Sequence, residues 1–360
     1  MRVLAATSHC DRSETYLYRR LREAGVELDV LCDPAATRLG ELREAGVPVH
    51  PLPFRSRFDW AAVRFLRALI KERGYDIVHT FNKRALTHVM LASRGLPTRI
   101  LTYRGIIGNL SRWNPEVRWT FFNARLAGIV CVCDAVREYV VAAGIASAKA
   151  RRIYKGHDPA WYASAERREL ERLGIPPGAF VVGSAGHLRP RKGLDTLVAA
   201  LARLPKGSAH LLLVGSISDP KVMRSIAEHG LGEVVHTPGF RADAAALMGA
   251  CDLFAMPSLR REGLPRAVIE AMIQGVPAMV TNVGGMPEIV EDGKSGRVVE
   301  PGNPAALAEA IAFFAEDADR RRTFGERARE RIRTAFDIET TVRETLRFYE
   351  DVVCSPRSAR

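Results

Sequence analysis

The sequence has no apolar run of the roughly 18 to 20 residues that a membrane-spanning helix requires. It also has no tandem repeat and no low-complexity segment. The N-terminus, MRVLAATSHC, enters a strand-like run directly, without the basic segment, apolar stretch and cleavage site of a secretory signal. We therefore expect a cytoplasmic protein.

Cysteine is scarce, and its six positions are scattered: 10, 32, 131, 133, 251 and 354. Cys131 and Cys133, in GIVCVC, are expected to project from one face of a strand, a spacing unlike the paired thiolates of structural zinc sites. We interpret the cysteines as small buried residues in a reducing compartment and expect no metal site.

Acidic residues are too few to balance the basic ones, which leaves a formal net charge of +12. Nucleic acid, an anionic membrane surface and a phosphorylated ligand are candidate partners. Nucleic acid is disfavoured because the arginines form no recognition-helix or aromatic-sheet pattern. Residues 99–125 mix five arginines and one acid with aromatic residues, which suits a membrane headgroup layer if the segment is amphipathic. The alternative is that these aromatics pack inward and the arginines face water: Tyr103, Trp113, Trp119, Phe121 and Phe122.

Strand-like runs alternate with helical patterns along the chain, which indicates parallel sheets covered by helices. We expect an α/β protein with two doubly wound domains, residues 1–165 and 166–337. Residues 338–360 are expected to form a C-terminal helix with a frayed tail, and the helix is expected to pack back on the first domain. If the two ligand crevices beyond the strand ends face each other, they form one cleft. The strand-like runs are 3–8, 27–32, 76–80, 99–103, 128–133 and 151–156, then 180–186, 210–215, 234–239, 252–258 and 277–283.

The segment SAGHLRPRKGLDTLVAA (184–200) crowds Arg189, Arg191 and Lys192 into a loop and the first turn of the expected helix. Three cations at the positive end of a helix repel it unless an anion joins them. A phosphate group satisfies this arrangement, and a solvated basic loop is the alternative.

The segment REGLPRAVIEAMIQGVP (261–277) places Glu262 in a turn and Glu270 on the following helix. Pro265 suits the first helical position and Gly275 the C-terminal cap. Glu270 lies about 200° round the helix from Val268, a position of the packing stripe, so it is expected to point away from the core.

Two such carboxylates suit a glycosidase pair, a magnesium site or a ligand with adjacent hydroxyl groups. Magnesium is disfavoured because Arg260, Arg261 and Arg266 compete with a cation. Cations for a diphosphate and carboxylates for two sugars together indicate a sugar nucleotide, and we expect them on opposite walls of the cleft.

The combination of EGLPRAVIEAM, GVPAMVTNVGGMPEIVEDGKSGRVVEPGNPAALAEAI, GHLRPRKG and CDLFAMPS resembles the retaining glycosyltransferases of family four, which have the GT-B fold. The resemblance is strong over residues 180–315 and weaker in DIVHTFN, VCVCDAVREYV and YKGHD. It implies transfer of a sugar from a nucleotide-sugar donor to a glycan or lipid-linked acceptor, as in polysaccharide or lipopolysaccharide assembly. It implies no metal or other cofactor, and a position in the cytoplasm or on the inner face of the membrane.

The resemblance also implies roles for individual residues. Glu270 would bind the ribose hydroxyls, Glu262 would approach the donor sugar, and Lys192 would bind the diphosphate. The amides near the sugar and phosphates would be those of Gly263, Leu264 and Arg266, and the base would lie at residues 238–240, which include Gly239 and Phe240.

Three departures from the family pattern affect this assignment. His187 stands where the family has a phosphate-binding arginine, so the second cation would be Arg189 or Arg191, and we favour Arg191. Arg104 stands where a histidine is common, and SHCDRSE (8–14) replaces a glycine-rich turn. The candidate acceptor-side residues are His9, His79 and Arg104, although histidines at strand ends often have structural roles.

Two other functions fit the same pattern. The fold also supports phosphorylases, and a membrane-associated protein could retain the nucleotide-sugar site without catalysis. The sequence leaves the base, sugar, acceptor, linkage and oligomeric state open.

Overall fold

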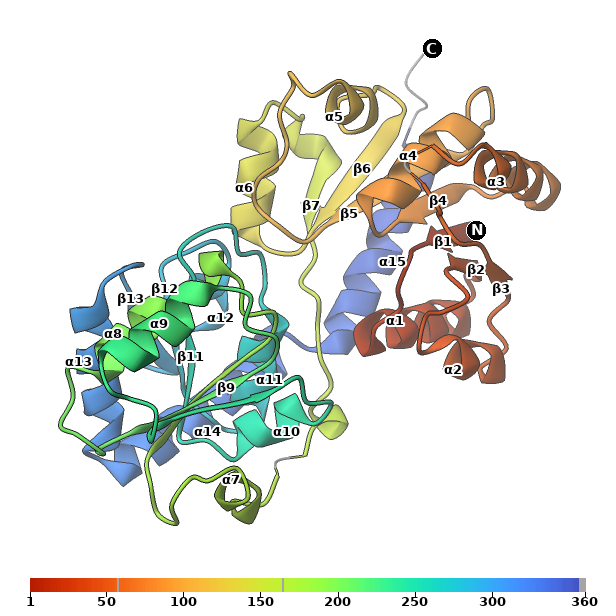
Figure 1. Ribbon diagram of the computed structural model, residues 1–360. Helices are drawn as coiled ribbons and strands as arrows, with labels where there is room; N and C mark the ends of the chain where they lie inside the picture. Colours follow the sequence, from red (N-terminus) through yellow and green to blue (C-terminus); the bar gives the residue numbers. More distant parts are fainter. Residues whose placement is uncertain (57, 164, 356–360) are drawn as a thin grey trace. The chain divides into compact units, whose positions relative to one another are not determined.

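The computed structural model describes residues 1–56, 58–163 and 165–355, and the chain forms two compact units (Figure 1). The N-terminal unit comprises Met1–Gly156 and Ile338–Arg360, and the C-terminal unit comprises His157–Asp337. The first boundary therefore falls after Gly156 and not after residue 165. His157 already belongs to the second unit because its amide donates to the carbonyl of Phe336 (2.8 Å) and it forms a β-bridge with Asp337.

The N-terminal unit contains a seven-stranded parallel sheet in the order β3-β2-β1-β4-β5-β6-β7. The strand order reverses between β1 and β4, which are neighbours in space but not in sequence. Crevices for ligands form at such a switch point, beyond the carboxyl ends of the strands. The strands are β1 (Arg2–Ala6), β2 (Glu27–Cys32), β3 (Val49–Pro51), β4 (Ile77–Thr80), β5 (Arg99–Arg104), β6 (Leu126–Cys131) and β7 (Ala150–Arg152).

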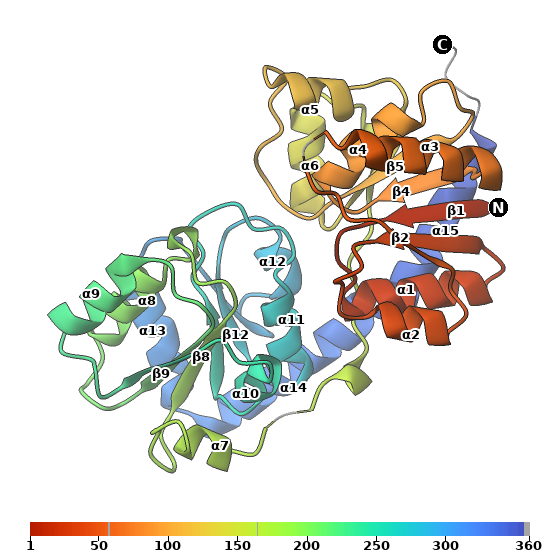
Figure 2. The ribbon, with the colours of Figure 1, turned by 45° about the vertical axis from the view of Figure 1, so that its right-hand side comes forward.

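Helices cover both faces of this sheet (Figure 2). Helices α3, α4 and α5 lie side by side in one layer, with α3 packed on α4 and α4 on α5. On the other face, α1 packs on the C-terminal helix α15, whose Tyr349 is completely buried. The helices are α1 (Arg12–Glu23), α2 (Leu39–Glu44), α3 (Trp60–Arg73), α4 (Lys83–Ala92), α5 (Pro115–Thr120), α6 (Asp134–Ala142) and α15 (Ile338–Cys354).

The C-terminal unit contains a six-stranded parallel sheet in the order β10-β9-β8-β11-β12-β13, with its switch point between β8 and β11. The strands are β8 (Val181–Ala185), β9 (His210–Val214), β10 (Val235–Gly239), β11 (Leu253–Met256), β12 (Ala278–Thr281) and β13 (Gly296–Val299). The helices are α7 (Arg168–Glu171), α8 (Leu194–Leu201), α9 (Pro220–Glu228), α10 (Ala244–Gly249), α11 (Arg266–Ile273), α12 (Met286–Ile289), α13 (Pro304–Ala315) and α14 (Ala318–Ala335).

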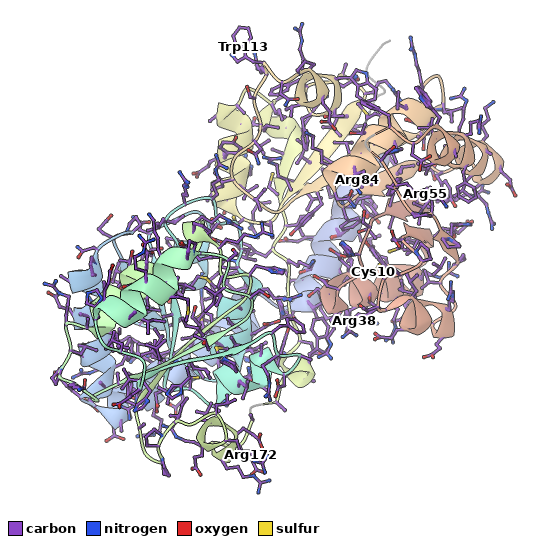
Figure 3. The ribbon with its side chains drawn as sticks, viewed as in Figure 1. Cys10, Arg38, Arg55, Arg84, Trp113 and Arg172 are labelled. Atoms are coloured by element: carbon purple, nitrogen blue, oxygen red, sulfur yellow. The ribbon has the colours of Figure 1, made fainter. Side chains whose placement is uncertain are left out.

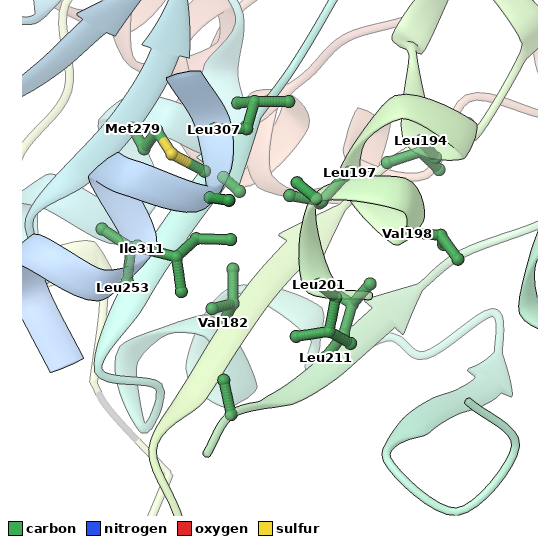
Figure 4. Close-up of a cluster of buried hydrophobic side chains, with 14 of the residues drawn as sticks. Val182, Leu194, Leu197, Val198, Leu201, Leu211, Leu253, Met279, Leu307 and Ile311 are labelled. Carbon is green, nitrogen blue, oxygen red and sulfur yellow. The ribbon is translucent and has the colours of Figure 1, made fainter. Parts of the chain in front are cut away.

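Aliphatic side chains from the strands and helices of this unit form its core (Figure 4). Val182 of β8 and Leu211 of β9 meet Leu197 of α8 and Ile311 of α13 in one buried cluster. Every residue of β9 is buried because helices cover both faces of the sheet, which explains why the strand reads as a continuous apolar run. This core holds the loops after β8 and β11 in fixed positions.

Residues 99–125 form β5, a loop and the short helix α5, so they are not the single amphipathic segment that the membrane interpretation required. Phe121 is buried and Trp119 is half-buried, as the inward-packing alternative predicts. Trp113 is the exception, because it is 94% exposed and projects from the surface (Figure 3).

The cysteines are free thiols, and all except Cys354 are buried. Cys131 and Cys133 do not share a strand face, because β6 ends at Cys131 and Cys133 is the N-cap of α6. Within the described ranges, no group of three or more His, Cys, Asp or Glu residues has the arrangement of a metal site. No helix among those residues combines the length and the apolar character needed to cross a bilayer.

Candidate functional site

The loop after β8 carries the cations that the sequence indicated. Pro190–Lys192 form a 3-10 turn, and α8 begins only at Leu194, so Arg191 and Lys192 precede the helix and do not lie in its first turn. Gly193 follows them with a φ of +65°, and a Cβ there would lie 2.3 Å from the carbonyl oxygen of Pro257. Only glycine fits this close approach, which brings the loop after β8 against the loop after β11.

The loop after β11 carries Glu262, and its backbone is tightly fixed. Arg261 has a φ of +62°, in the left-handed region that residues with a side chain rarely adopt. A Cβ on Gly284 would lie 2.0 Å from the carbonyl oxygen of Glu262, and the amide of Gly285 donates to the carbonyl of Gly263 (3.0 Å). The segment after β12 therefore supports the backbone of the Glu262 turn.

Glu262 accepts three polar contacts on one carboxylate oxygen. Its Oε1 lies 2.9 Å from Lys192 Nζ, 3.3 Å from Arg191 Nη1 and 2.9 Å from Ser258 Oγ. Glu262 is only 6% exposed, so these donors replace the water that a carboxylate would otherwise keep. Ser258 is a member of this cluster that the sequence did not single out, although its place at the end of the strand-like run 252–258 was a signal.

The cations and the carboxylate therefore come from the same unit and lie in direct contact. The expectation that they occupy opposite walls of a cleft is wrong, because the β8 and β11 strands that carry them are neighbours in one sheet. Neighbouring parallel strands bring the loops at their carboxyl ends together. Of the two alternative arginines, Arg191 reaches this cluster, whereas Arg189 is exposed, as is His187.

Glu270 lies on α11 and is partly exposed, with 16% of its side chain accessible. Its Oε1 is 3.1 Å from Nε of Arg266, one helical turn earlier. The helix starts one residue later than expected, because Pro265 is the N-cap and Arg266 the first helical residue. The C-cap is Gln274, and Gly275 follows it with a φ of +85°.

The remaining candidates on the donor side lie on loops of the same unit. Gly263 is buried and Leu264 is half-buried between Glu262 and α11. Gly239 ends β10 with a φ of +79°, and the next residue, Phe240, is 79% exposed. An exposed ring beside a glycine turn offers a flat face to a planar group.

A groove of about 480 Å³ lies at the carboxyl ends of β1 and β4 in the N-terminal unit. It contains hydroxyl, carboxylate, amide and cationic groups together with one phenylalanine ring, a mixture suited to a hydroxyl-rich ligand. The lining residues are Thr7, Ser8, His9, Asp11, Glu14, Phe81, Asn82 and Arg84.

Only one of the three acceptor-side candidates from the sequence lines this groove, namely His9. His79 is 1% exposed, and its Nδ1 forms a hydrogen bond with the Tyr349 hydroxyl (2.8 Å). Burial lowers the pKa of His79 to about 3, so its ring is neutral. Arg104 is also buried, with its guanidinium over the ring of Phe121, and burial lowers its pKa. The side chains of His79 and Arg104 are thus part of the interior of the N-terminal unit, and neither lines the groove.

Lys155 is a further residue that the sequence analysis missed. Its Nζ lies 2.5 Å from Asp11 Oδ2 and 2.9 Å from Glu14 Oε1. Burial favours the neutral amine, but the Glu14 and Asp11 carboxylates outweigh it and raise the pKa of Lys155. SHCDRSE, which departs from the family pattern, and YKGHD, which resembles it, thus meet in one ion cluster at the groove.

Two family models match the chain in succession. The model for Glycosyltransferase Family 4 matches residues 12–161, and the model for glycosyl transferases group 1 matches residues 166–331.

Among curated proteins, a D-inositol 3-phosphate glycosyltransferase of Corynebacterium glutamicum is 30% identical over 215 residues, or 56% of this chain and 51% of the relative. A GDP-mannose-dependent alpha-(1-6)-phosphatidylinositol monomannoside mannosyltransferase of Mycobacterium tuberculosis is 37% identical over 185 residues, or 48% of this chain and 46% of the relative. The chain thus spans about half the length of the curated relatives it matches.

Solved structures match almost the whole chain. HepE of Anabaena, in complex with UDP, has a TM-score of 0.83 and 24% identity, and the match covers 98% of this chain and 100% of that one. A glycosyltransferase from Rickettsia africae has a TM-score of 0.82 and 20% identity, with 99% of each chain covered. At these identities the likeness shows the fold alone.

Proposed function

Because the chain belongs to glycosyltransferase family 4 and has the GT-B fold, we propose that it transfers a sugar from a nucleotide-sugar donor to a glycan or lipid-linked saccharide acceptor. The observation that carries this proposal is the cluster of Lys192, Arg191 and Glu262 at the switch point of the C-terminal sheet. It combines cations suited to a diphosphate with a carboxylate suited to sugar hydroxyls, at the edge where open parallel sheets bind ligands.

In the proposed donor complex, Lys192 and Arg191 contact the pyrophosphate and Glu262 contacts the sugar. In the structure, both cations are paired with Glu262. A diphosphate carries more negative charge than one carboxylate, so it competes effectively for them. Glu270 would accept from two adjacent ribose hydroxyls, with Arg266 fixing its carboxylate, and Phe240 would stack on the base.

Departure of a nucleoside diphosphate leaves negative charge on the β-phosphate while the anomeric carbon gains positive character. Lys192 and Arg191 stabilise the first charge, and in this proposal they supply what a magnesium ion supplies in other transferases. Removing one such donor typically costs about 3 to 4 kcal/mol of transition-state stabilisation. We propose retention of anomeric configuration, with the leaving phosphate accepting the acceptor's proton on the same face of the sugar.

On the acceptor side, we propose that the groove at β1 and β4 receives the saccharide. The relatives named above support a lipid-linked acceptor, since one is described as acting on a phosphatidylinositol monomannoside. Such an acceptor would place the enzyme in the cytoplasm at the inner face of the membrane.

The test is incubation of the protein with UDP-, GDP- and ADP-sugars and a set of polyprenyl- and inositol-linked saccharides, with release of nucleoside diphosphate as the readout. Thermal stabilisation by the free nucleotides would first identify the base, because a ligand that binds only the folded state raises the melting temperature. NMR of the product would report the anomeric configuration. No release with any donor would contradict the proposal.

A matched pair of variants separates this function from its alternatives. Lys192→Met should reduce release by about 10²-fold or more, whereas Lys206→Met, at an exposed site of the same unit, should not. Turnover that requires inorganic phosphate would instead indicate a phosphorylase. Nucleotide binding without any turnover would indicate a non-catalytic protein.

A further inference from the structure

Helix α3 presents a surface that the fold does not use. Its inner side carries Ala62, Val63, Leu66, Leu69 and Ile70, all buried. Its outer side exposes two large aromatic side chains, since Trp60 is 63% and Phe65 is 41% exposed. The inner side already supplies the packing that holds the helix on the core. Large apolar side chains that stay exposed on the opposite side therefore indicate an interaction surface.

Basic residues lie between these aromatics. Arg64 and Lys71 are exposed and fall within about 40° of Trp60 round the helix axis. Neither has an ion-pair partner among the described residues, although many arginines of this protein are paired. Glu72 is the one acid of this outer side of α3. We call the surface formed by Trp60, Arg64, Phe65 and Lys71 the α3 face.

The α3 face is held rigidly. The side chain of Asp59 caps the helix by accepting from the Ala62 amide (3.1 Å), and the Asp59 amide donates to Nε2 of His88 on α4 (3.0 Å). Arg67 donates to the carbonyls of Ala92 and Arg94 (2.9 and 2.7 Å). A rigid surface loses little conformational entropy when a partner covers it.

The α3 face also adjoins the groove at β1 and β4. Arg84, which lines the groove, donates to the carbonyl of Phe54 (3.1 Å), in the loop that leads into α3. Because α3 returns the chain to the start of β4, its first turn, with Trp60, lies toward the carboxyl ends of the strands, where the groove opens.

We propose that the α3 face docks the protein on a bilayer that contains anionic lipids. Trp and Phe side chains insert at the boundary between headgroups and acyl chains, and the neighbouring cations pair with lipid phosphates. Charge complementarity favours this partner over a protein of ordinary surface composition, since the face is basic on a chain whose net charge is already +12. The α3 face is a different surface from residues 99–125, which the sequence suggested as the membrane contact. Among the aromatic residues of that segment, Trp113 alone is almost fully exposed.

This inference extends the proposed function, because a lipid-linked acceptor would reach the groove directly from the bilayer. Binding to vesicles, however, requires neither donor nor acceptor. The two proposals can therefore fail independently.

The test is flotation of the full-length protein with vesicles of phosphatidylcholine alone or with about 30% phosphatidylglycerol. The wild type should float with the anionic vesicles. Its partition to the neutral vesicles should be weaker by about tenfold or more. Trp60→Ser/Phe65→Ser and Arg64→Glu/Lys71→Glu should each weaken the partition by about tenfold or more.

Matched controls keep the result specific. Arg203→Glu/Lys206→Glu changes the net charge equally at exposed sites of the C-terminal unit, and Met223→Ser removes an exposed apolar side chain there. Both should float like the wild type. Melting temperature, and its rise with UDP or GDP, should be unchanged in the α3 variants, which establishes that they are folded.

Several outcomes would overturn the proposal. One is that the wild type does not bind anionic vesicles. Another is that Arg203→Glu/Lys206→Glu weakens binding as much as Arg64→Glu/Lys71→Glu. Loss of flotation on Trp113→Ser, with Trp60→Ser/Phe65→Ser unaffected, would move the contact to residues 105–114. A dimer in solution that Trp60→Ser/Phe65→Ser dissociates would assign the face to a second copy of the chain.

Discussion

Lys192 Nζ lies 2.9 Å from Glu262 Oε1, so the cation and the carboxylate of the candidate site neutralise each other. A ligand that takes one of them must release the other. This pairing gives each residue two roles, and substitutions can separate them.

Glu262→Gln should uncouple nucleotide binding from transfer. The amide keeps the shape of the side chain but leaves Lys192 and Arg191 without their carboxylate, so affinity for a free nucleoside diphosphate should stay equal or rise severalfold. Sugar transfer should fall by about 10² to 10³-fold if the carboxylate acts on the donor sugar. Calorimetry with UDP and GDP and a turnover assay measure the two effects. Glu300→Gln, at an exposed position of the same unit, is the control, and weaker nucleotide binding in Glu262→Gln would contradict the expectation.

Gly284→Ala should disturb the backbone of the Glu262 turn, although Gly284 is not close to Glu262 in the sequence. The new Cβ would lie 2.0 Å from the carbonyl oxygen of Glu262, in addition to the strain of a φ of +59°. Gly293→Ala introduces a similar strain, with a φ of +70°, but its Cβ meets open space. Gly293→Ala should cost about 1 kcal/mol of unfolding free energy and Gly284→Ala clearly more. Equal urea midpoints for the two variants would show that the close approach is not important.

Lys155→Met should destabilise the protein by leaving Asp11 and Glu14 close together without their cation. The expected loss is about 1 to 3 kcal/mol of unfolding free energy, measured by urea denaturation. The triple variant Asp11→Asn/Glu14→Gln/Lys155→Met should recover part of it, because no uncompensated charge remains and asparagine still caps α1. A triple variant that is less stable than the single one would indicate that the ion cluster itself stabilises the fold.

Stability should fall as the solution becomes more acidic, in part through His79. Burial lowers the pKa of His79 to about 3 from an ordinary value of 6.5, so the unfolded chain binds a proton there more readily than the folded one. The stability is therefore complete above pH 6.5 and decreases below it, by up to about 1.4 kcal/mol per pH unit from this residue. His210 and His236, whose pKa values are also lowered by burial, act in the same direction. His79→Gln should show a shallower dependence between pH 7 and 5 in urea denaturation, and an unchanged slope would contradict the assignment.

The strand pattern and the local motifs predicted much of this structure. Continuous apolar runs such as HLLLV became buried parallel strands, and the family and the GT-B fold recognised from EGLPRAVIEAM and its companion motifs are confirmed. These features depend on residues close together in sequence, so the sequence displays them directly. The same holds for Glu262 and Lys192, which lie in the loops that follow β11 and β8.

Contacts between distant segments could not be predicted in this way. Lys155 meets Asp11 although the two are 144 residues apart in the sequence and follow strands, β7 and β1, that are not neighbours in the sheet. A lysine in YKGHD looks like an ordinary surface residue. Arg104 was likewise predicted to be a site residue because its position in the sequence matches a family motif. In the structure its guanidinium lies over the ring of Phe121, a contact that arises from tertiary packing. Which face of α3 is covered also depends on the order of strands in the sheet.

The C-terminal helix has a consequence for synthesis. Tyr349 fills the interior of the N-terminal unit and holds His79, yet it is made after all of residues 157–337. On the ribosome, the second unit can acquire its full set of contacts while the first still lacks its last helix. The N-terminal unit is therefore completed after the C-terminal one, and a premature stop before residue 338 would leave its core open to water.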